Sequence, residues 1–138
     1  VSPNAKETVV GEGRSALFHA ASYGATDIVH LLIAKGADVN ETKDGRRTPL
    51  MMAAVQGYEE VVVVLLNAGA NINAREGETG ATALTDSVRK GHVGVAKTLI
   101  SRGADVNVKL KDGNTPLSWA RNRGNLEVEK LLLQAGAK

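Results

Sequence analysis

The side chains that could carry out chemistry are few and widely separated. His19 and His30 fall on different predicted helices, and His92 follows a glycine at a position that predicts a helix start, so the three histidines do not form a ligand set. The chain has no cysteine, which excludes disulfides and thiol catalysis but leaves the redox compartment open. We therefore expect no metal site and no cofactor.

Two further patterns resemble parts of active sites without completing them. Asp86 and Arg89 are three residues apart on a predicted helix, where a surface ion pair worth roughly a few tenths of a kcal/mol explains them better than acid–base catalysis. Gly77-Glu78-Thr79-Gly80 lacks the lysine and the spacing of a phosphate-binding loop. We expect that the chain is not an enzyme.

Charge and hydropathy exclude other classes of protein. The formal net charge is +2, from 17 basic and 15 acidic residues that are interspersed along the chain, which is too mild to predict binding to nucleic acid. No apolar run approaches the roughly 20 residues that a membrane-spanning helix needs. We expect a globular protein without membrane insertion that is monomeric in isolation.

A repeat organises the elements that carry these residues. Steps of 33, 34 and 33 residues separate four leucines, Leu17, Leu50, Leu84 and Leu117, and each leucine is followed by a glycine seven positions later. A second glycine series with the same steps, each member followed by alanine, comprises Gly36, Gly69, Gly103 and Gly136. A fixed period of this length indicates stacked supersecondary units.

Each unit is predicted to contain two short helices. In the first unit, Ser15 is suited to cap a helix that buries Leu17 and ends at Gly24. A second helix is expected to begin at about Thr26 and to stop at Gly36, since glycine accepts the positive φ at which helices commonly end.

The second unit follows the same plan with stronger local signals. Thr48 is a helix cap and Pro49 occupies the first helical position, where a backbone N–H is not required. The run from Val61 to Leu66 would be a strand by propensity alone. The equivalent residues of the other units have helical spacing, and β-branched residues cost only roughly a few tenths of a kcal/mol in a helix, so we predict a helix.

The period divides residues 11–138 into a single domain of four repeats, at about 11–43, 44–76, 77–110 and 111–138. The first three repeats contain Asn40, Asn73 and Asn107, which we expect to stabilise turns through bonds to the backbone. In the last repeat Arg121 and Glu129 replace small apolar residues of the earlier repeats. Charges on a face without a following neighbour are typical of a terminal unit, so we interpret residues 117–138 as a C-terminal cap.

Residues 1–10 allow two interpretations. Asn4-Ala5-Lys6-Glu7 resembles Asn73-Ala74-Arg75-Glu76, the end of the second repeat. The segment is therefore either the remnant of a preceding repeat or an N-terminal tail with a chance similarity.

Together these pieces resemble an ankyrin-repeat protein. The family's T-P-L, A-A, G, V-V-x-L-L and G-A-D-V-N elements stand here as Thr48-Pro49-Leu50, Ala53-Ala54, Gly57, Val61-Val62 with Leu65-Leu66, and Gly36-Ala37-Asp38-Val39-Asn40. The histidine that often follows T-P-L in that family is replaced by Phe18, Met51, Thr85 and Ser118. We expect its hydrogen bonds to be missing and apolar contacts of Phe18 and Met51 to replace them.

The resemblance implies an all-α fold, an ankyrin-repeat solenoid of stacked helix-turn-helix units joined by β-hairpin-like loops. In such a solenoid the loop tips and the first helices line a concave side. Residues at these positions that vary among the repeats are released from packing, and we expect them to contact a partner: Arg14, Tyr23, Arg46, Arg47, Met52, Gln56, Asp86, Arg89, Lys90, Lys111, Trp119 and Arg123.

Two features of this set leave alternatives open. Trp119 is either an interface hot spot or a side chain packed against its own terminal helix. The arginines and lysines of the set would form a basic stripe that attracts an acidic protein surface, although the solvated rim of a solenoid can have the same composition.

The expected function is that of a non-enzymatic protein–protein interaction module, a scaffold, adaptor or regulator. It would bind a partner protein of unknown identity through its concave surface and loop tips. The alternative is a structural spacer or oligomerisation segment of a larger multidomain protein. The sequence does not indicate a compartment, and the cytoplasm is the default expectation.

Overall fold

The computed structural model describes residues 15–42 and 46–138, so the segment 1–10 and the predicted contact residue Arg14 lie outside the described ranges. Within those ranges the chain forms only α-helices: α1 (Ala16–Ser22), α2 (Thr26–Ala34), α3 (Pro49–Gln56), α4 (Glu59–Asn67), α5 (Ala83–Lys90), α6 (Val93–Ser101), α7 (Pro116–Asn122) and α8 (Leu126–Gln134). The predicted all-α fold is confirmed, including a helix over the valine run of the second repeat.

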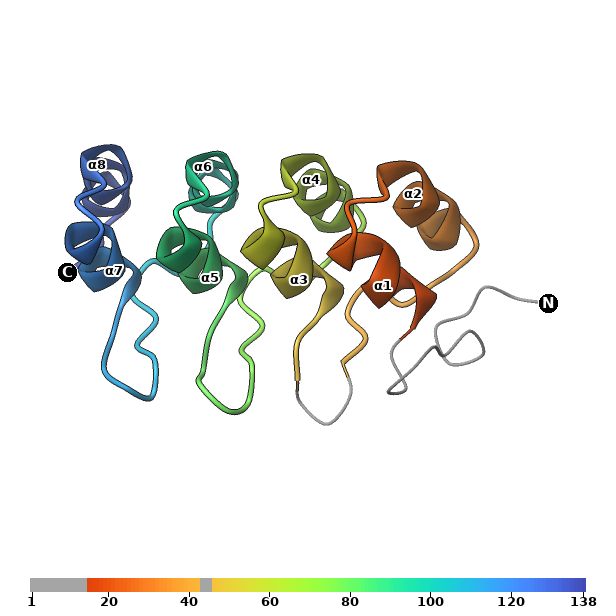
Figure 1. Ribbon diagram of the computed structural model, residues 1–138, viewed down its shortest axis with the longest axis horizontal. Coiled ribbons are helices and arrows are strands. Elements are labelled where there is room, and N and C mark those ends of the chain that lie inside the picture. The colour runs from red at the N-terminus through yellow and green to blue at the C-terminus, as the bar shows by residue number, and fades with distance from the viewer. Residues whose placement is uncertain (1–14, 43–45) are drawn as a thin grey trace.

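The helices form a one-dimensional stack of four antiparallel pairs (Figure 1). The first helices, α1, α3, α5 and α7, lie side by side in one row, and the second helices, α2, α4, α6 and α8, lie side by side in another. The loops that connect successive pairs extend away from both rows in the same direction. This arrangement is the helix-turn-helix solenoid that the repeat predicts.

The first helix of each repeat begins at a hydroxyl side chain. Thr48 Oγ1 accepts a hydrogen bond of 3.2 Å from the Met51 amide, and Ser15 Oγ accepts one of 3.1 Å from the Phe18 amide. Such a cap satisfies one of the amides that a helix N-terminus leaves without a partner, and it contributes about 1 kcal/mol. The caps predicted from Ser15 and Thr48 are confirmed.

The position after T-P-L differs from the sequence-based expectation in two repeats. Thr85 and Ser118 complete capping boxes, in which their hydroxyls accept from the amides of Thr82 and Thr115 at 2.8 and 2.9 Å. We expected only the loss of the hydrogen bonds that the family's histidine makes, but a short hydroxyl side chain supplies hydrogen bonds at this position. Met51 is buried in the second repeat, as expected for an apolar replacement.

Aliphatic side chains fill the space between neighbouring pairs. Val61, Val62 and Leu65 of α4 are fully buried, and they belong to one continuous core that runs from α1 to α8. Burying a valine or leucine side chain contributes about 1.5–3 kcal/mol, several times the cost of placing a β-branched residue in a helix. Packing therefore decides the conformation of the valine run.

The turn glycines satisfy two requirements at once. Gly57 has φ of 84°, and a Cβ atom built on it would lie 2.7 Å from Nδ1 of His92 in the next repeat. Gly24, with φ of 72°, has the same relation to the ring of Tyr58, at 2.9 Å. The glycine thus permits both the left-handed turn and the close approach of the following helix pair.

The asparagines link successive repeats, whereas we expected them to stabilise turns. Asn40 Nδ2 donates to Gly69 O at 3.2 Å, and Asn40 Oδ1 accepts from the Asn71 amide at 2.6 Å. The local turn is stabilised by Asp38, whose Oδ1 accepts from the Asn40 amide at 2.9 Å. Asn107 makes the same pair of bonds to Gly136 and Lys138. The sequence-based assignment was wrong because the partners lie about one repeat away in the chain.

We predict that Gly57→Ala destabilises the fold more than Gly69→Ala. Both glycines have positive φ, so each substitution introduces a backbone strain of about 1 kcal/mol or more. Only at Gly57 does the new methyl group meet another side chain, because nothing lies within 4 Å of a Cβ built at Gly69. Urea unfolding of both variants measures the difference, and equal losses of free energy would contradict the packing role of Gly57.

Candidate protein-interaction surface

The variable residues form rows along the stack. Tyr23, Gln56, Lys90 and Arg123 occupy equivalent positions just before the turn glycine of each repeat, and all four are exposed, Tyr23 by 78%. Met52, Asp86 and Trp119 share a second position, two residues after the repeat leucine. We call the exposed edge of the first helices, together with the adjoining loops, the finger-side surface. The structure thus places most of the predicted contact residues on one side of the molecule.

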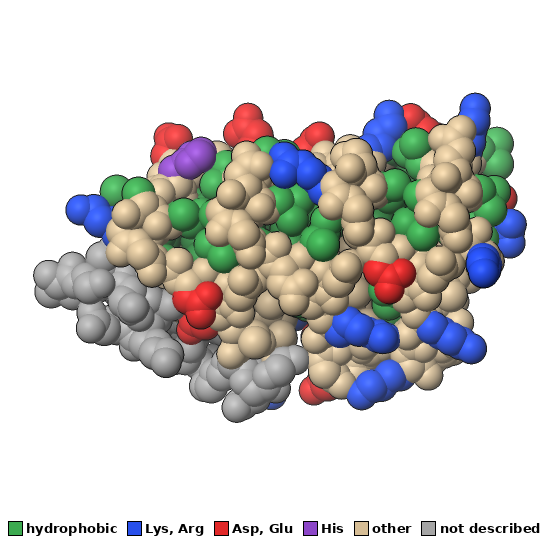
Figure 2. Space-filling model, turned by 180° about the vertical axis from the view of Figure 1, so that it is seen from behind, with side chains coloured by type: hydrophobic (Ala, Val, Ile, Leu, Met, Phe, Trp, Pro, Cys, Tyr) green, Lys and Arg blue, Asp and Glu red, His purple; other side chains and the backbone are tan. Residues whose placement is uncertain are grey.

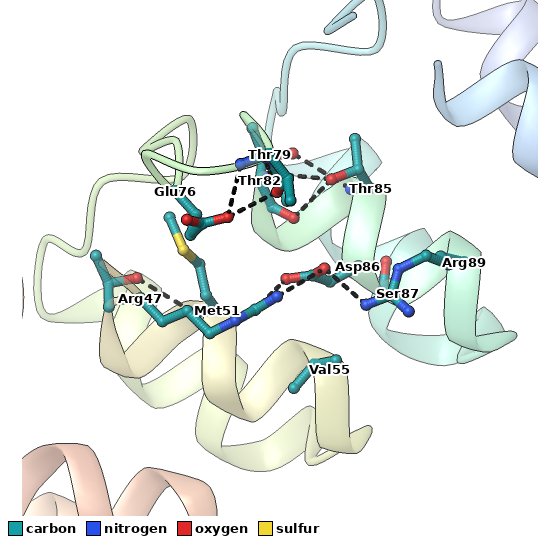
Figure 3. Close-up of polar contacts among 12 residues, drawn as sticks. Arg47, Met51, Val55, Glu76, Thr79, Thr82, Thr85, Asp86, Ser87 and Arg89 are labelled. Atoms are coloured by element: carbon teal, nitrogen blue, oxygen red, sulfur yellow. Dashed lines mark hydrogen bonds and ion pairs between the residues drawn. The ribbon is translucent and has the colours of Figure 1, made fainter. Parts of the chain in front are cut away.

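Three of these residues form an ion cluster that crosses two repeats (Figure 3). Arg47 Nη1 donates to Asp86 Oδ2 at 2.5 Å, and Arg47 Nη2 approaches Oδ1 at 3.3 Å. Arg89 Nη2 donates to the same Oδ1 at 3.2 Å. The side chain of Asp86 is only 1% exposed, whereas those of Arg47 and Arg89 are 27% and 35% exposed. Asp86 is therefore the buried centre of the cluster.

The burial of Asp86 corrects its predicted role. We expected Asp86 on the exposed edge, in a surface ion pair with Arg89 alone. The loop before α3 brings Arg47 over the carboxylate from the preceding repeat, 39 residues away in the chain. Asp86 does not contact solvent, so it is not available as a contact residue, and its charge is compensated within the protein.

The cluster presents positive charge to solvent. Burial alone would lower the pKa of the Arg47 guanidinium, but its hydrogen bond to Asp86 and the charges of Asp86 and Glu76 together raise that pKa. Arg47 is therefore cationic, and its guanidinium group shares one buried carboxylate with that of Arg89. The exposed parts of the cluster are guanidinium edges, which form bidentate bonds with carboxylates and phosphates.

Glu76 is a second buried carboxylate on this side, and the sequence analysis did not identify it. It accepts bonds from the Glu78 amide at 2.5 Å, from the Thr79 amide at 3.1 Å and from Thr79 Oγ1 at 2.6 Å. Burial would raise the pKa of Glu76, but these bonds and the charge of Arg47 lower it. Glu76 therefore fixes the loop tip of the third repeat. The only sequence signal for this role of Glu76 was its place three residues before a threonine in a glycine-containing loop.

Basic residues connect the tips of the last two loops. Arg75 donates from Nε to Gly80 O at 2.9 Å and from Nη2 to Lys109 O at 2.6 Å. Lys111 Nζ donates to Gly77 O at 2.6 Å. Figure 2 shows blue side chains gathered over these loops at the lower right. Arg75 and Lys109 were not predicted, while the predicted Lys111 is exposed and also joins the two loops.

The remaining predicted contact residues differ in their solvent exposure and in the hydrogen bonds they make. Arg46 and Gln56 are exposed, and Met52 is half-buried. Arg123 is exposed, and its Nη1 donates to Arg89 O of the preceding repeat at 2.9 Å. Trp119 is half-buried against the core, and its Nε1 has no hydrogen-bond acceptor within the described part of the chain. The indole thus packs partly against the core while retaining an exposed portion.

Residues 15–42 and 46–138 contain neither a cluster of metal ligands nor a membrane-spanning helix. No group of three histidine, cysteine or acidic side chains there could hold a metal ion. None of the helices in these ranges has the length and hydropathy required to cross a bilayer. His92 has a structural contact, because its Nε2 lies 3.0 Å from Val55 O of the preceding repeat.

Comparison with known families agrees with this geometry. The family model described as "Ankyrin repeats (3 copies)" matches residues 1–76 and 74–138. The chain belongs to the ankyrin-repeat family. Ankyrin repeats are protein-interaction modules, and a family of this kind is typically not catalytic.

Several curated relatives contain a similar segment. The chain is 37% identical over 119 residues to "Ankyrin repeat and KH domain-containing protein mask-1" of Caenorhabditis elegans, covering 86% of this chain and 4% of the relative. It is 44% identical over 103 residues to "Ankyrin repeat and KH domain-containing protein 1" of Homo sapiens, covering 74% and 4%. It is 33% identical over 118 residues to "Probable E3 ubiquitin-protein ligase XBOS34" of rice, covering 84% and 23%. The chain thus spans a quarter or less of the length of each of these proteins.

We predict that Arg47 and Asp86 are energetically coupled. Arg47→Ala leaves the buried Asp86 carboxylate with Arg89 alone, so it should lower the free energy of unfolding by about 2 kcal/mol or more. In an Asp86→Ala background the same substitution should cost about 1–3 kcal/mol less, as measured by a double-mutant cycle in urea. The matched control is Arg46→Ala, which removes an exposed neighbouring arginine and should cost less than about 0.5 kcal/mol. Additive costs for Arg47 and Asp86 would contradict the coupling.

We also predict a pH dependence that arises from Glu76. The pKa of Glu76 is lowered in the folded state, so its contribution is present above the ordinary value of 4.5 and is lost as the pH falls through the folded-state pKa. Glu76→Gln should lower the free energy of unfolding by about 1–2 kcal/mol at pH 7, and the difference from wild type should shrink as the pH falls below 4.5. Urea unfolding between pH 7 and pH 3 tests this, with Glu78→Gln as the exposed control in the same loop. A difference that does not change with pH would show that the charge of Glu76 is not involved.

Proposed function

We propose that the chain is a non-enzymatic interaction module that holds an acidic partner protein against its finger-side surface, as a scaffold, adaptor or regulator. By its resemblance to other ankyrin stacks, we take this surface to be the concave side. The observation that carries the proposal is the distribution of charge on this side: its basic residues are exposed or partly exposed, while the carboxylates of Asp86 and Glu76 are buried and bonded within the protein.

The charge arrangement favours an acidic partner. Arg46, Lys90, Lys111 and Arg123 are exposed along the surface, and the arginines around Asp86 add partly exposed guanidinium groups. Asp86 and Glu76 are buried, and both oxygens of each carboxylate accept bonds from within the protein. Glu78 and Asp112 are exposed acidic residues of the neighbouring loops. Complementary charge of this kind increases association rates and selects partners more than it increases affinity.

The frame supports binding because it is preformed. Asn40, Arg47 and His92 each bond to a neighbouring repeat, so the side chains that vary are held at a fixed spacing. A partner that docks on such a surface orders few residues, and less of the interaction energy is lost to conformational entropy. Exposed Tyr23 at one end and half-buried Trp119 at the other offer aromatic contact area within the same surface.

A charge-reversal pair tests the proposal. The variant Arg46→Glu with Lys90→Glu changes two exposed residues of the finger-side surface, and its matched control, Lys35→Glu with Lys130→Glu, makes the same charge change on the row of second helices. Both proteins should unfold at the wild-type urea midpoint, since all four residues are exposed. Capture of proteins from a lysate of the source cells, quantified by mass spectrometry, should fail only for the finger-side variant. Equal capture by both variants would overturn the assignment of the surface.

Nucleic acid is the competing acidic ligand, and a titration separates it from a protein partner. Binding to duplex DNA through the same cations would weaken steeply between about 50 and 200 mM salt. With a formal net charge of +2, we expect no measurable affinity for a duplex at either concentration. Salt-dependent binding to the duplex that is lost in the finger-side variant would replace the protein partner with a nucleic acid.

A further inference from the structure

The N-terminal end of the stack exposes two apolar side chains, at positions that are buried or half-buried in the other repeats. On α2, Ile28 is 53% exposed and Leu31 is 55% exposed, although both are large aliphatic side chains. α2 and α1 form the pair at this end of the solenoid (Figure 1). We call the surface around Ile28 and Leu31 the N-terminal end face.

The position of Ile28 can be compared in all four repeats. It lies four residues after the turn glycine, as do Val61, Val95 and Val128, which are 0%, 2% and 2% exposed. Val128 belongs to the last pair and remains buried without a following pair in the described chain. The cover of this position therefore comes from the preceding helix pair, and only Ile28 has no described pair in front of it.

The residue at the next position is buried by the helix pair that follows it, not by the pair that precedes it. Val29, Val62 and Ala96 are fully buried, and Val29 is buried although it belongs to the first pair, so its cover comes from the pair that follows. At the same position the last repeat has Glu129, which bonds to Arg121 Nε at 3.1 Å. The sequence thus replaces an apolar residue with a charged one at the C-terminal end but retains isoleucine at the N-terminal end.

The N-terminal and C-terminal ends of the stack differ in the partner that can dock on them. Leu126 and Leu133 are also exposed on α8, but a helix pair docked there would have to desolvate the Arg121–Glu129 ion pair. Desolvation of an ion pair commonly costs as much as its attraction returns. A second copy of this chain in head-to-tail contact would bring the same ion pair onto Ile28. Both arguments favour an apolar helix pair as the occupant of the N-terminal end face.

We propose that the N-terminal end face docks a further ankyrin helix pair, which stacks on α1 and α2 as these stack on α3 and α4. The interface continues the one that already joins the four described pairs, with Ile28 and Leu31 in the places that Val61 and Val64 occupy between the first two. In the sequence, Asn4-Ala5-Lys6-Glu7 precedes this pair and resembles the residues that end the second repeat. The proposal does not depend on the finger-side surface.

An added repeat tests this assignment. Residues 1–10 are replaced by a copy of residues 44–76, so that the copy joins residue 11 and the spacing from its asparagine to Leu17 equals the ten residues from Asn40 to Leu50. Thermal unfolding of the original and extended chains is followed by circular dichroism, each with and without Ile28→Glu. We expect a single transition at higher temperature in the extended chain, and Ile28→Glu should lower that midpoint by more than about 5 °C while changing the original chain by less than about 2 °C. The control Val61→Glu should lower the midpoint of both chains.

Three outcomes would overturn the proposal. An equal effect of Ile28→Glu on both chains would show that the chain already covers the face by itself. A wild-type dimer in sedimentation that becomes monomeric with Ile28→Glu would identify a second copy as the occupant. A separate unfolding transition of the added unit would show that the face does not accept a helix pair. This conclusion requires that a copy of residues 77–110, added in the same place, also unfolds in a separate transition.

Discussion

Apolar stacking of one helix pair on the next is the interaction on which the rest of this structure depends. A pair of nine-residue or shorter helices has two broad faces and cannot bury both by itself. The described core is accordingly continuous from Leu17 to Ala137, with small residues such as Ala54 and Ala96 where pairs approach closely. Position in the repeat therefore determines which residues must be apolar. The same constraint explains the turn glycines, the helical valine run, and the exposure of Ile28 where the described stack ends.

Polar links between repeats turn this stack into a surface of fixed geometry. The Asn40 bonds to the next repeat, the His92 contact with Val55 and the Arg47–Asp86 ion pair each join residues about one repeat apart in the chain. Because each link spans neighbouring units, none can form in an isolated helix pair. The exposed residues between these links vary from repeat to repeat without affecting the core. This division of positions makes it possible for one frame to present different binding surfaces.

Whether a residue of the candidate surface could be predicted depends on how far apart in the chain its interaction partners lie. Tyr23, Gln56, Lys90 and Arg123 could be placed from the period alone, because exposure just before the turn glycine is a property of the repeat. Asp86 could not, since its burial depends on an arginine 39 residues earlier. Glu76 and Arg75 were missed for the same reason: their roles arise from the folded shape of one loop and its contact with the next. Trp119 is packed on the core and still partly exposed, so its role as an interface hot spot stays a prediction.

The sequence by itself determined the family, the helix pairs of the described residues and their caps, because period, apolar spacing, hydroxyl caps and glycines act within one repeat. Only the tertiary structure decided which charges are buried, which asparagines join repeats, and that Ile28 is left exposed at the N-terminal end of the stack. These properties depend on what lies against a residue from a neighbouring pair. A local pattern specifies that a residue faces its neighbour, but the presence and chemistry of that neighbour appear only when the pairs are assembled.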